Sequence, residues 1–171
     1  MQLRSKCEIN NRKSANHKTD ANILSLAVNT LKNESYHLGA GLITATIFFM
    51  ITSSVVYSVV ALVWSLFIDT DHLPDYIYYL IKNKIKFSLK EFLSGTYIRK
   101  LGKFTAPLHS WELWLVILIA GFTNELPILI IISTTTLIHL TVDSFTNCVN
   151  ARFYFLTYRL INKFDTKTIL S

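Results

Sequence analysis

Two long apolar runs, at residues 38–68 and 111–142, dominate the pattern of hydrophobic and polar positions along the chain. Polar segments precede, separate and follow these runs. Before the first run, apolar positions at residues 22–33 recur at helical spacing, which predicts a short surface helix. Between the runs, residues 76–92 are typical of an amphipathic helix that carries four lysines. The pattern therefore predicts an all-α protein.

The length of the apolar runs raises the question of how each one is folded. A straight helix of about 31 residues would be about 46 Å long, whereas the hydrocarbon core of a bilayer is about 30 Å thick. Folded as a hairpin, each run instead gives two arms of about 14 residues, which is short for a full crossing. Length alone favours neither arrangement.

The distribution of charge favours two helical hairpins. The loop between the runs carries seven Lys and Arg residues between positions 76 and 104, and one acid, Glu91. One crossing per run would place this loop across the membrane from two basic tails, against the positive-inside tendency. Two hairpins keep all three basic segments on the cytoplasmic side, with turns near residues 52–54 and 123–125 that contain no Lys or Arg. We therefore expect an integral membrane bundle of about four apolar helices plus the amphipathic surface helix.

The composition agrees with a membrane protein. Of 171 residues, 51% are hydrophobic and only 16% are charged, whereas about a quarter of the residues in a soluble domain are charged. The net charge of +6 does not indicate nucleic-acid binding, because the 17 basic residues lie outside the apolar runs and no recognised signature accompanies them. We expect a polar, basic N-terminal tail at residues 1–35, a membrane-embedded domain at 36–150, and a basic, aromatic C-terminal tail at 151–171 whose rings suit a membrane surface.

Four of the five histidines lie at or near the ends of apolar arms, beside carboxylates. The histidines are His37, His72, His109 and His139, and the carboxylates are Asp69, Asp71, Asp75, Glu112 and Asp143. The pair Asp69 and His72 is three residues apart and the pair His139 and Asp143 is four apart, so each pair can share one face of a helix. Imidazole and carboxylate groups are common zinc ligands, and ionisable residues at membrane depth are usually functional. Because hairpins return both ends of each run to one face, we expect these side chains to converge on a metal ion.

Simpler structural interpretations stay open for several of these residues. His37 can act as an interfacial anchor beside Tyr36, and Asp75 can cap the helix that follows Pro74. Glu112 can be an ordinary acid in the first turn of a helix. A purely structural interpretation is weaker for Asp71 with His72 and for His139 with Asp143.

At these positions the chain resembles the membrane-bound metal-dependent hydrolases of the YdjM type, a family distantly similar to zinc-dependent phospholipase C. That family has an early His that opens an apolar helix, then a Pro-Asp-x-Asp-His box, a Thr-His-Ser box and a His-x3-Asp-x2-Thr box. The corresponding elements here are His37, residues 69–72, residues 108–110 and residues 139–146. The resemblance covers about residues 36–150, in the same order and at plausible spacing.

The chain also departs from the pattern of that family. Ile68 replaces the Pro before the second box, and Leu108 replaces the Thr of the third. The His-Arg-Gly that usually precedes the third box is absent, with residues 103–107 in its place. A missing upstream His removes one potential ligand or proton donor, so metal binding can differ or activity can be lost.

The resemblance implies a metal-dependent hydrolase of the inner or plasma membrane, and the charge distribution places both tails and the site on the cytoplasmic side. The expected metal is zinc, and its expected ligands are Asp69, His72, His109, His139 and Asp143, with Asp71 and His37 as second choices. Asp71 or Glu112 would take a proton from the attacking water. The expected partner is membrane lipid, and the expected substrate is a phospholipid or another phosphoester. The alternative is a non-enzymatic membrane protein, an inactive family member or a scaffold, whose boundary His and Asp residues are structural.

Overall fold

The computed structural model describes residues 20–147 and 151–169, and this part of the chain is helical and contains no β-strand. Its helices are α2 (Asp20–Thr52), α3 (Val55–Phe67), η1 (Ile68–His72), α4 (Leu73–Asn83), α5 (Leu89–Leu93), α6 (Thr96–Leu101), α7 (Trp111–Thr123), α8 (Pro127–Thr146), η2 (Ala151–Tyr154), α9 (Leu156–Ile161) and α10 (Thr166–Ile169). The prediction of an all-α fold is confirmed. Residues 1–19 of the expected N-terminal tail at 1–35 lie outside the described residues.

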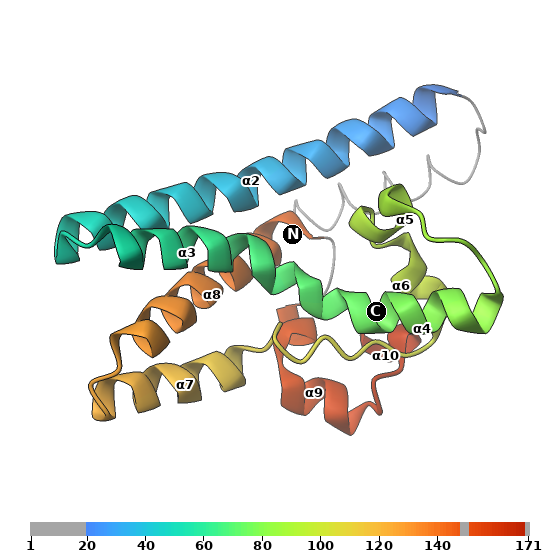
Figure 1. Cartoon of the computed structure of the whole chain (residues 1–171). Helices are drawn as coiled ribbons and strands as arrows, with labels where there is room; N and C mark the ends of the chain where they lie inside the picture. Colours follow the sequence, from blue (N-terminus) through green and yellow to red (C-terminus); the bar gives the residue numbers. More distant parts are fainter. Residues whose placement is uncertain (1–19, 148–150, 170–171) are drawn as a thin grey trace.

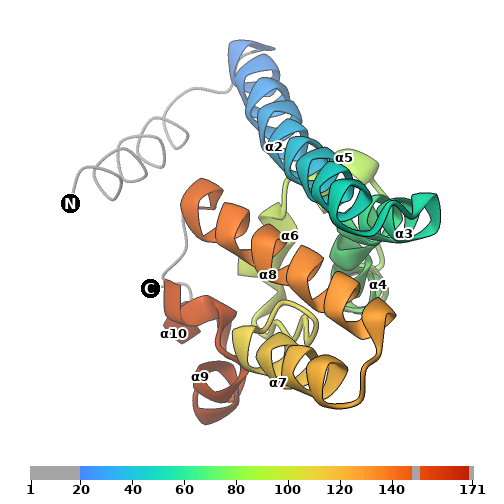
Figure 2. The same cartoon turned by 90° about the vertical axis from the view of Figure 1, so that its left-hand side faces the viewer.

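Two antiparallel hairpins form the centre of the fold, as the sequence predicted. The first pairs α2 with α3, the second pairs α7 with α8, and both turns lie at the same end of the molecule (Figure 1). Ser54 caps α3 by accepting a hydrogen bond from the Tyr57 amide, and Pro127 occupies the first turn of α8. The view along the hairpins shows α8 between the first hairpin and α7 (Figure 2), and α8 packs against α2, α3 and α7.

Two helices differ in extent from their predictions. Residues 22–33 are helical, but they form one continuous helix with the first apolar arm instead of a separate surface helix. The amphipathic helix expected at 76–92 is wrong as a single element, because α4 ends at Asn83 and α5 begins only at Leu89. Lys84 takes a left-handed conformation there, with φ 53°, and its N–H bonds back to carbonyls of the last turn of α4. The Tyr76 hydroxyl then binds both the N–H and the C=O of Ser88, which folds the chain back onto α4.

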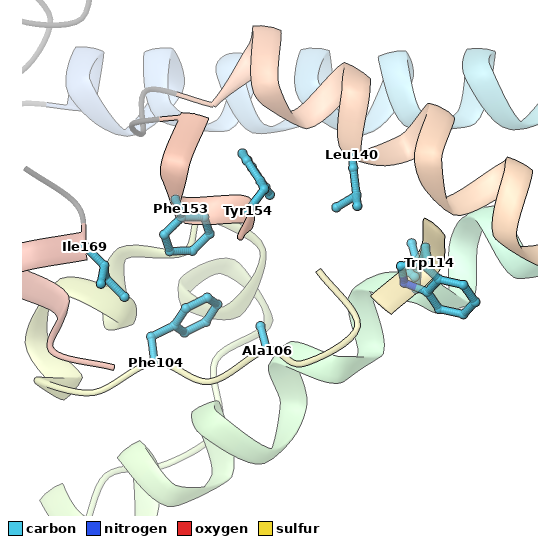
Figure 3. Packing of buried hydrophobic residues seen from close by; sticks show 8 residues of the cluster. Phe104, Ala106, Trp114, Leu140, Phe153, Tyr154 and Ile169 are labelled. Atoms are coloured by element: carbon cyan, nitrogen blue, oxygen red, sulfur yellow. The ribbon is translucent and has the colours of Figure 1, made fainter. Parts of the chain in front are cut away.

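The C-terminal segment also differs from the expected tail. Its described residues 151–169 pack against the hairpins, and Phe153, Tyr154 and Ile169 are buried in the main core. Figure 3 shows these side chains beside Phe104, with Leu140 of α8 facing them. The rings of Phe153 and Tyr154 therefore pack in the protein interior and do not belong to a membrane-surface belt.

Three helical stretches are long and apolar enough to cross a membrane: Ser35–Thr52, Val55–Asn83 and Pro127–Thr146. The second of these combines α3, η1 and α4, which follow one another without a break. The shorter helix α7 is also apolar. Only 22% of the residues in each of the first two stretches are buried inside the molecule, so most of their apolar side chains face outwards. Apolar surface of this extent is typical of a protein that associates with a membrane.

Close packing within the first hairpin depends on a glycine in α2. A Cβ atom added at Gly41 would lie 2.9 Å from the Cβ of Ser65 and still closer to its hydroxyl, whereas a Cβ at Gly39 would meet nothing within 4 Å. We expect Gly41→Ala to force α2 and α3 apart and to lower the free energy of unfolding by about 1–3 kcal/mol. Gly39→Ala is the matched control, and it should be neutral or raise stability by up to about 1 kcal/mol, because Ala favours helix. Thermal unfolding in detergent would measure both variants, and equal effects would contradict the packing argument.

Candidate metal centre

The sequence-predicted ligands meet at the ends of the hairpin arms that are remote from the turns. His37 comes from α2, while Asp69, Asp71 and His72 come from η1. His109 lies in the loop before α7, and both His139 and Asp143 lie on α8. The structure thus brings together side chains that are up to 106 positions apart in the sequence, as the hairpin arrangement predicted.

Four donor atoms converge at the middle of this cluster. The Nε2 atoms of His109 and His139 each lie 3.3 Å from Oδ1 of Asp69, and each lies 3.5 Å from Oδ2 of Asp143. Ligands in a tetrahedral zinc site, bound at about 2.0–2.2 Å, are about 3.3–3.6 Å from one another. Both Nε2 atoms are buried without a hydrogen-bond partner, which is unusual for buried polar groups. The donor set and its spacing therefore fit a divalent metal ion.

Asp71 lies beside His109, on the Nδ1 side of its ring. Its Oδ1 faces Nδ1 of His109 at 2.9 Å, and its Oδ2 accepts a hydrogen bond from the Leu108 amide at 2.8 Å. A carboxylate on the outer nitrogen of an imidazole fixes the tautomer and directs the other nitrogen to the metal. Oδ2 of Asp71 is thus hydrogen-bonded to the backbone, and Oδ1 forms a close ion pair with the His109 ring. The carboxylate that was expected to take a proton or bind metal is thus placed to position His109.

His37 and His72 lie beside different members of the four central donors. His37 Nε2 lies 3.3 Å from Oδ1 of Asp143, and the rings of His37 and His139 are 4.3 Å apart. His72 stacks on Phe104 with ring centroids 5.2 Å apart, and its Nε2 is 3.9 Å from Asp69 Oδ1. Two triads of potential ligands result, and the ligand atoms within each triad lie within 4.8 Å of one another. The triads are His37, His139 and Asp143, and Asp69, His72 and His109.

Glu112, one of the two expected proton acceptors, joins the starts of two helices through hydrogen bonds. Its carboxylate accepts hydrogen bonds from the amides of Leu156 and Thr157, from the Thr157 hydroxyl, and from Ser110. These bonds fix the start of α9 against the start of α7. Among the described residues, none of these bonds of Glu112 reaches the central donors, so the hydrogen bonds give no support to Glu112 as the proton acceptor.

Asp75 is also structural, although its partners differ from those of a simple helix cap. Its carboxylate accepts hydrogen bonds from the Thr105 amide, the Thr105 hydroxyl and the Ala106 amide. Asp75 therefore joins α4 to the loop that carries His109. Together with the hydrogen bond that the Leu108 amide donates to Asp71, this holds three backbone N–H groups of that loop, at Thr105, Ala106 and Leu108.

Arg159 of α9 holds the same loop from the opposite side, and the sequence analysis gave it no role. Its guanidinium is fully buried and donates hydrogen bonds to the backbone carbonyls of Thr105, Ala106 and His109. Burial lowers the pKa of Arg159, and the nearby negative charge of Asp71 partly counteracts this effect. No local pattern distinguishes Arg159 from the other basic residues of the expected tail.

Among the described residues of the cluster, the exposed side chains belong to η1. The side chain of Asp69 is 39% exposed and that of His72 is 22% exposed, whereas those of His37, His109, His139 and Asp143 are all at most 6% exposed. A ligand therefore reaches the centre past η1. Three carboxylates around buried imidazoles also make the interior of the cluster favourable for a cation.

Comparison with known proteins adds no relative: no family model, curated protein or solved structure matches this chain.

Proposed function

We propose that this chain is a membrane-bound, metal-dependent hydrolase that cleaves a phosphoester, with zinc as its metal. The observation that carries the proposal is the convergence of two buried, unpartnered imidazole nitrogens and two carboxylate oxygens at 3.3–3.5 Å. Its resemblance to the YdjM-type hydrolases supports the same chemistry, since the converging residues belong to the boxes of that family.

Each side chain has a distinct part in the proposed site. Asp69, His109, His139 and Asp143 would hold the metal, which when bound lowers the pKa of water towards 7 and polarises a phosphoryl oxygen. Asp71 directs His109 towards the metal. His72 is partly exposed at the open edge, where it can contact the substrate or extend the ligand set.

The proposed location is the inner or plasma membrane, with several crossings and with the site on the cytoplasmic side. The apolar helices support membrane association. The side assignment rests on the seven basic residues between positions 76 and 104, because basic loops favour the cytoplasmic face. These residues are also suited to anionic lipid headgroups, since each basic residue near such a surface contributes about 1 kcal/mol.

Removal and return of the metal would test the proposed function. We expect the protein purified in mild detergent to contain at least about one zinc per chain. It should hydrolyse bis(p-nitrophenyl) phosphate or phospholipid in mixed micelles, and dialysis against a chelator should lower the rate by about 100-fold or more. Added zinc should restore the rate. A well-folded protein that contains no metal would instead support the non-enzymatic alternative, in which the His and Asp cluster is structural.

A further inference from the structure

We propose that the metal centre lies within the apolar depth of one leaflet and opens sideways to lipid, so that its substrate is a membrane-resident amphiphile with a phosphoester headgroup. This inference rests on the proposed function, and it adds the route by which a substrate arrives. Three observations carry it: the depth of the ligands, the surface around them, and the position of the opening.

The first observation is the distance between the ligands and the hairpin turns. His37 precedes Thr52 by 15 residues, Asp69 follows Val55 by 14, and His139 follows Pro127 by 12. At 1.5 Å per residue, these ligands lie about 18–23 Å from the turns, which share one end of the molecule (Figure 1). The hydrocarbon core is about 30 Å thick. If the turns reach one boundary of the core, the centre lies roughly 10 Å inside the other.

The second observation is an exposed apolar stripe that continues past the level of the metal centre. Along α3, η1 and α4, exposed side chains recur every three or four residues, as on one face of a helix. The exposed members of this stripe are Val63, Leu66, Phe67, Thr70, Leu73, Pro74, Ile77, Tyr78 and Ile81. Among these nine residues, hydroxyl groups occur at Thr70 and Tyr78, and none is charged. The first charged residue after them is Lys82. Lipid-facing surface thus extends on both sides of Asp69.

The exposure of the stripe residues is large enough to require an apolar environment. Leu66 and Phe67 are each 55% exposed on the side of the turns, and Ile77 and Ile81 are 44% and 73% exposed beyond the centre. On α2, Tyr36 and Leu38 are 47% and 44% exposed at the level of His37. A continuous patch of this kind in water would promote aggregation. Acyl chains are therefore the occupant that best fits this surface.

The third observation is that the partly exposed potential ligands lie next to this stripe in the helical sequence. Asp69 lies three residues after Leu66 and four before Leu73, which places it between them on a helical surface. Asp69 and His72 are the only two partly exposed members of the potential ligand set. The partly exposed ligand Asp69 is therefore bordered by apolar side chains. A lipid can approach there with its chains along α3 and its phosphoester bond at the centre.

Accessibility of spin labels in vesicles would test this route without any need for activity. In a background with Cys7 and Cys148 replaced by Ser, single cysteines at Phe67, Leu73 and Ile77 would be spin-labelled. The protein would be reconstituted into vesicles of phosphatidylcholine and phosphatidylglycerol. We expect these three labels to collide more often with dissolved oxygen than with a water-soluble nickel chelate, as a label at Val56 near the turn should also do. A label at Lys86, beyond the stripe, should show the reverse.

The outcomes separate this inference from the proposed function. Nickel-dominated collisions at positions 67 and 73, in a protein that retains its zinc, would overturn lateral access and leave the metal site standing. Lipid-like collisions in a protein that never binds zinc would support the depth of the cluster and remove the proposed function. Zinc content measured on the same labelled samples provides the comparison.

Discussion

Replacing His109 and His139 together with alanine is expected to abolish zinc binding while the helical fold persists. The two Nε2 atoms supply half of the four central donors, and neither has another hydrogen-bond partner. Zinc bound by four protein ligands gains about 10–16 kcal/mol, so the loss of two ligands should weaken binding by roughly 10⁴-fold or more. Elemental analysis after purification should therefore find less than about a tenth of a zinc per chain, with helicity by circular dichroism close to that of the unmodified protein.

His72→Ala is the matched control for this double variant. His72 belongs to the same cluster, but its Nε2 is 3.9 Å from the nearest Asp69 oxygen and its side chain is 22% exposed. We expect it to retain at least one tightly bound zinc, because the four central donors are intact. Full zinc content in the double variant would show that the metal is held elsewhere. Equal loss in the His72 variant would show that His72 is one of the central ligands.

The features that the sequence predicted well are those set by length and by charge. Apolar runs too long for one crossing, with turn residues at their middle and basic residues at their ends, leave few arrangements other than hairpins. Once the hairpins form, residues at the two ends of each run must meet. That is why the positions of His37, His109 and His139 in one cluster followed from their spacing, once charge had favoured the hairpins.

The features that the sequence did not predict depend on contacts between distant segments. The break after Asn83 is accompanied by the bonds of the Tyr76 hydroxyl to Ser88, which no helical periodicity encodes. Glu112 looks like a first-turn acid locally, yet its partners are 44 and 45 positions away. Asp69 and Asp71 are nearly adjacent, and the 3₁₀ geometry of η1 turns one towards His109 Nε2 and the other towards His109 Nδ1.

Replacing Arg159 with methionine is expected to weaken both the fold and the metal site. The guanidinium binds backbone carbonyls of Thr105, Ala106 and His109, 50–54 positions away, and Arg159 itself is fully buried. Methionine fills much of the space but leaves these carbonyls without donors, which should lower the free energy of unfolding by about 3–5 kcal/mol. Because the loop also carries His109, we expect zinc affinity to fall by about 10–100-fold, as for other groups that position a metal ligand. Thermal unfolding and zinc competition with a chromophoric chelator would measure the two effects.

Two further variants separate the positioning role of Arg159 from a general effect of its charge. Lys167→Met removes one positive charge from the same segment, but Lys167 is exposed, so zinc affinity and stability should stay close to the original values. Arg159→Lys keeps the charge, but one ammonium group cannot reproduce the fork of donors that spans three carbonyls, so its zinc affinity should lie between those of the original protein and Arg159→Met. If Arg159→Met unfolds at a lower temperature but binds zinc as tightly as the original protein, Arg159 stabilises the C-terminal segment without controlling His109. The predicted coupling between the C-terminal segment and the metal centre would then be wrong. Asp71 and Asp75 alone would be enough to hold the loop that carries His109.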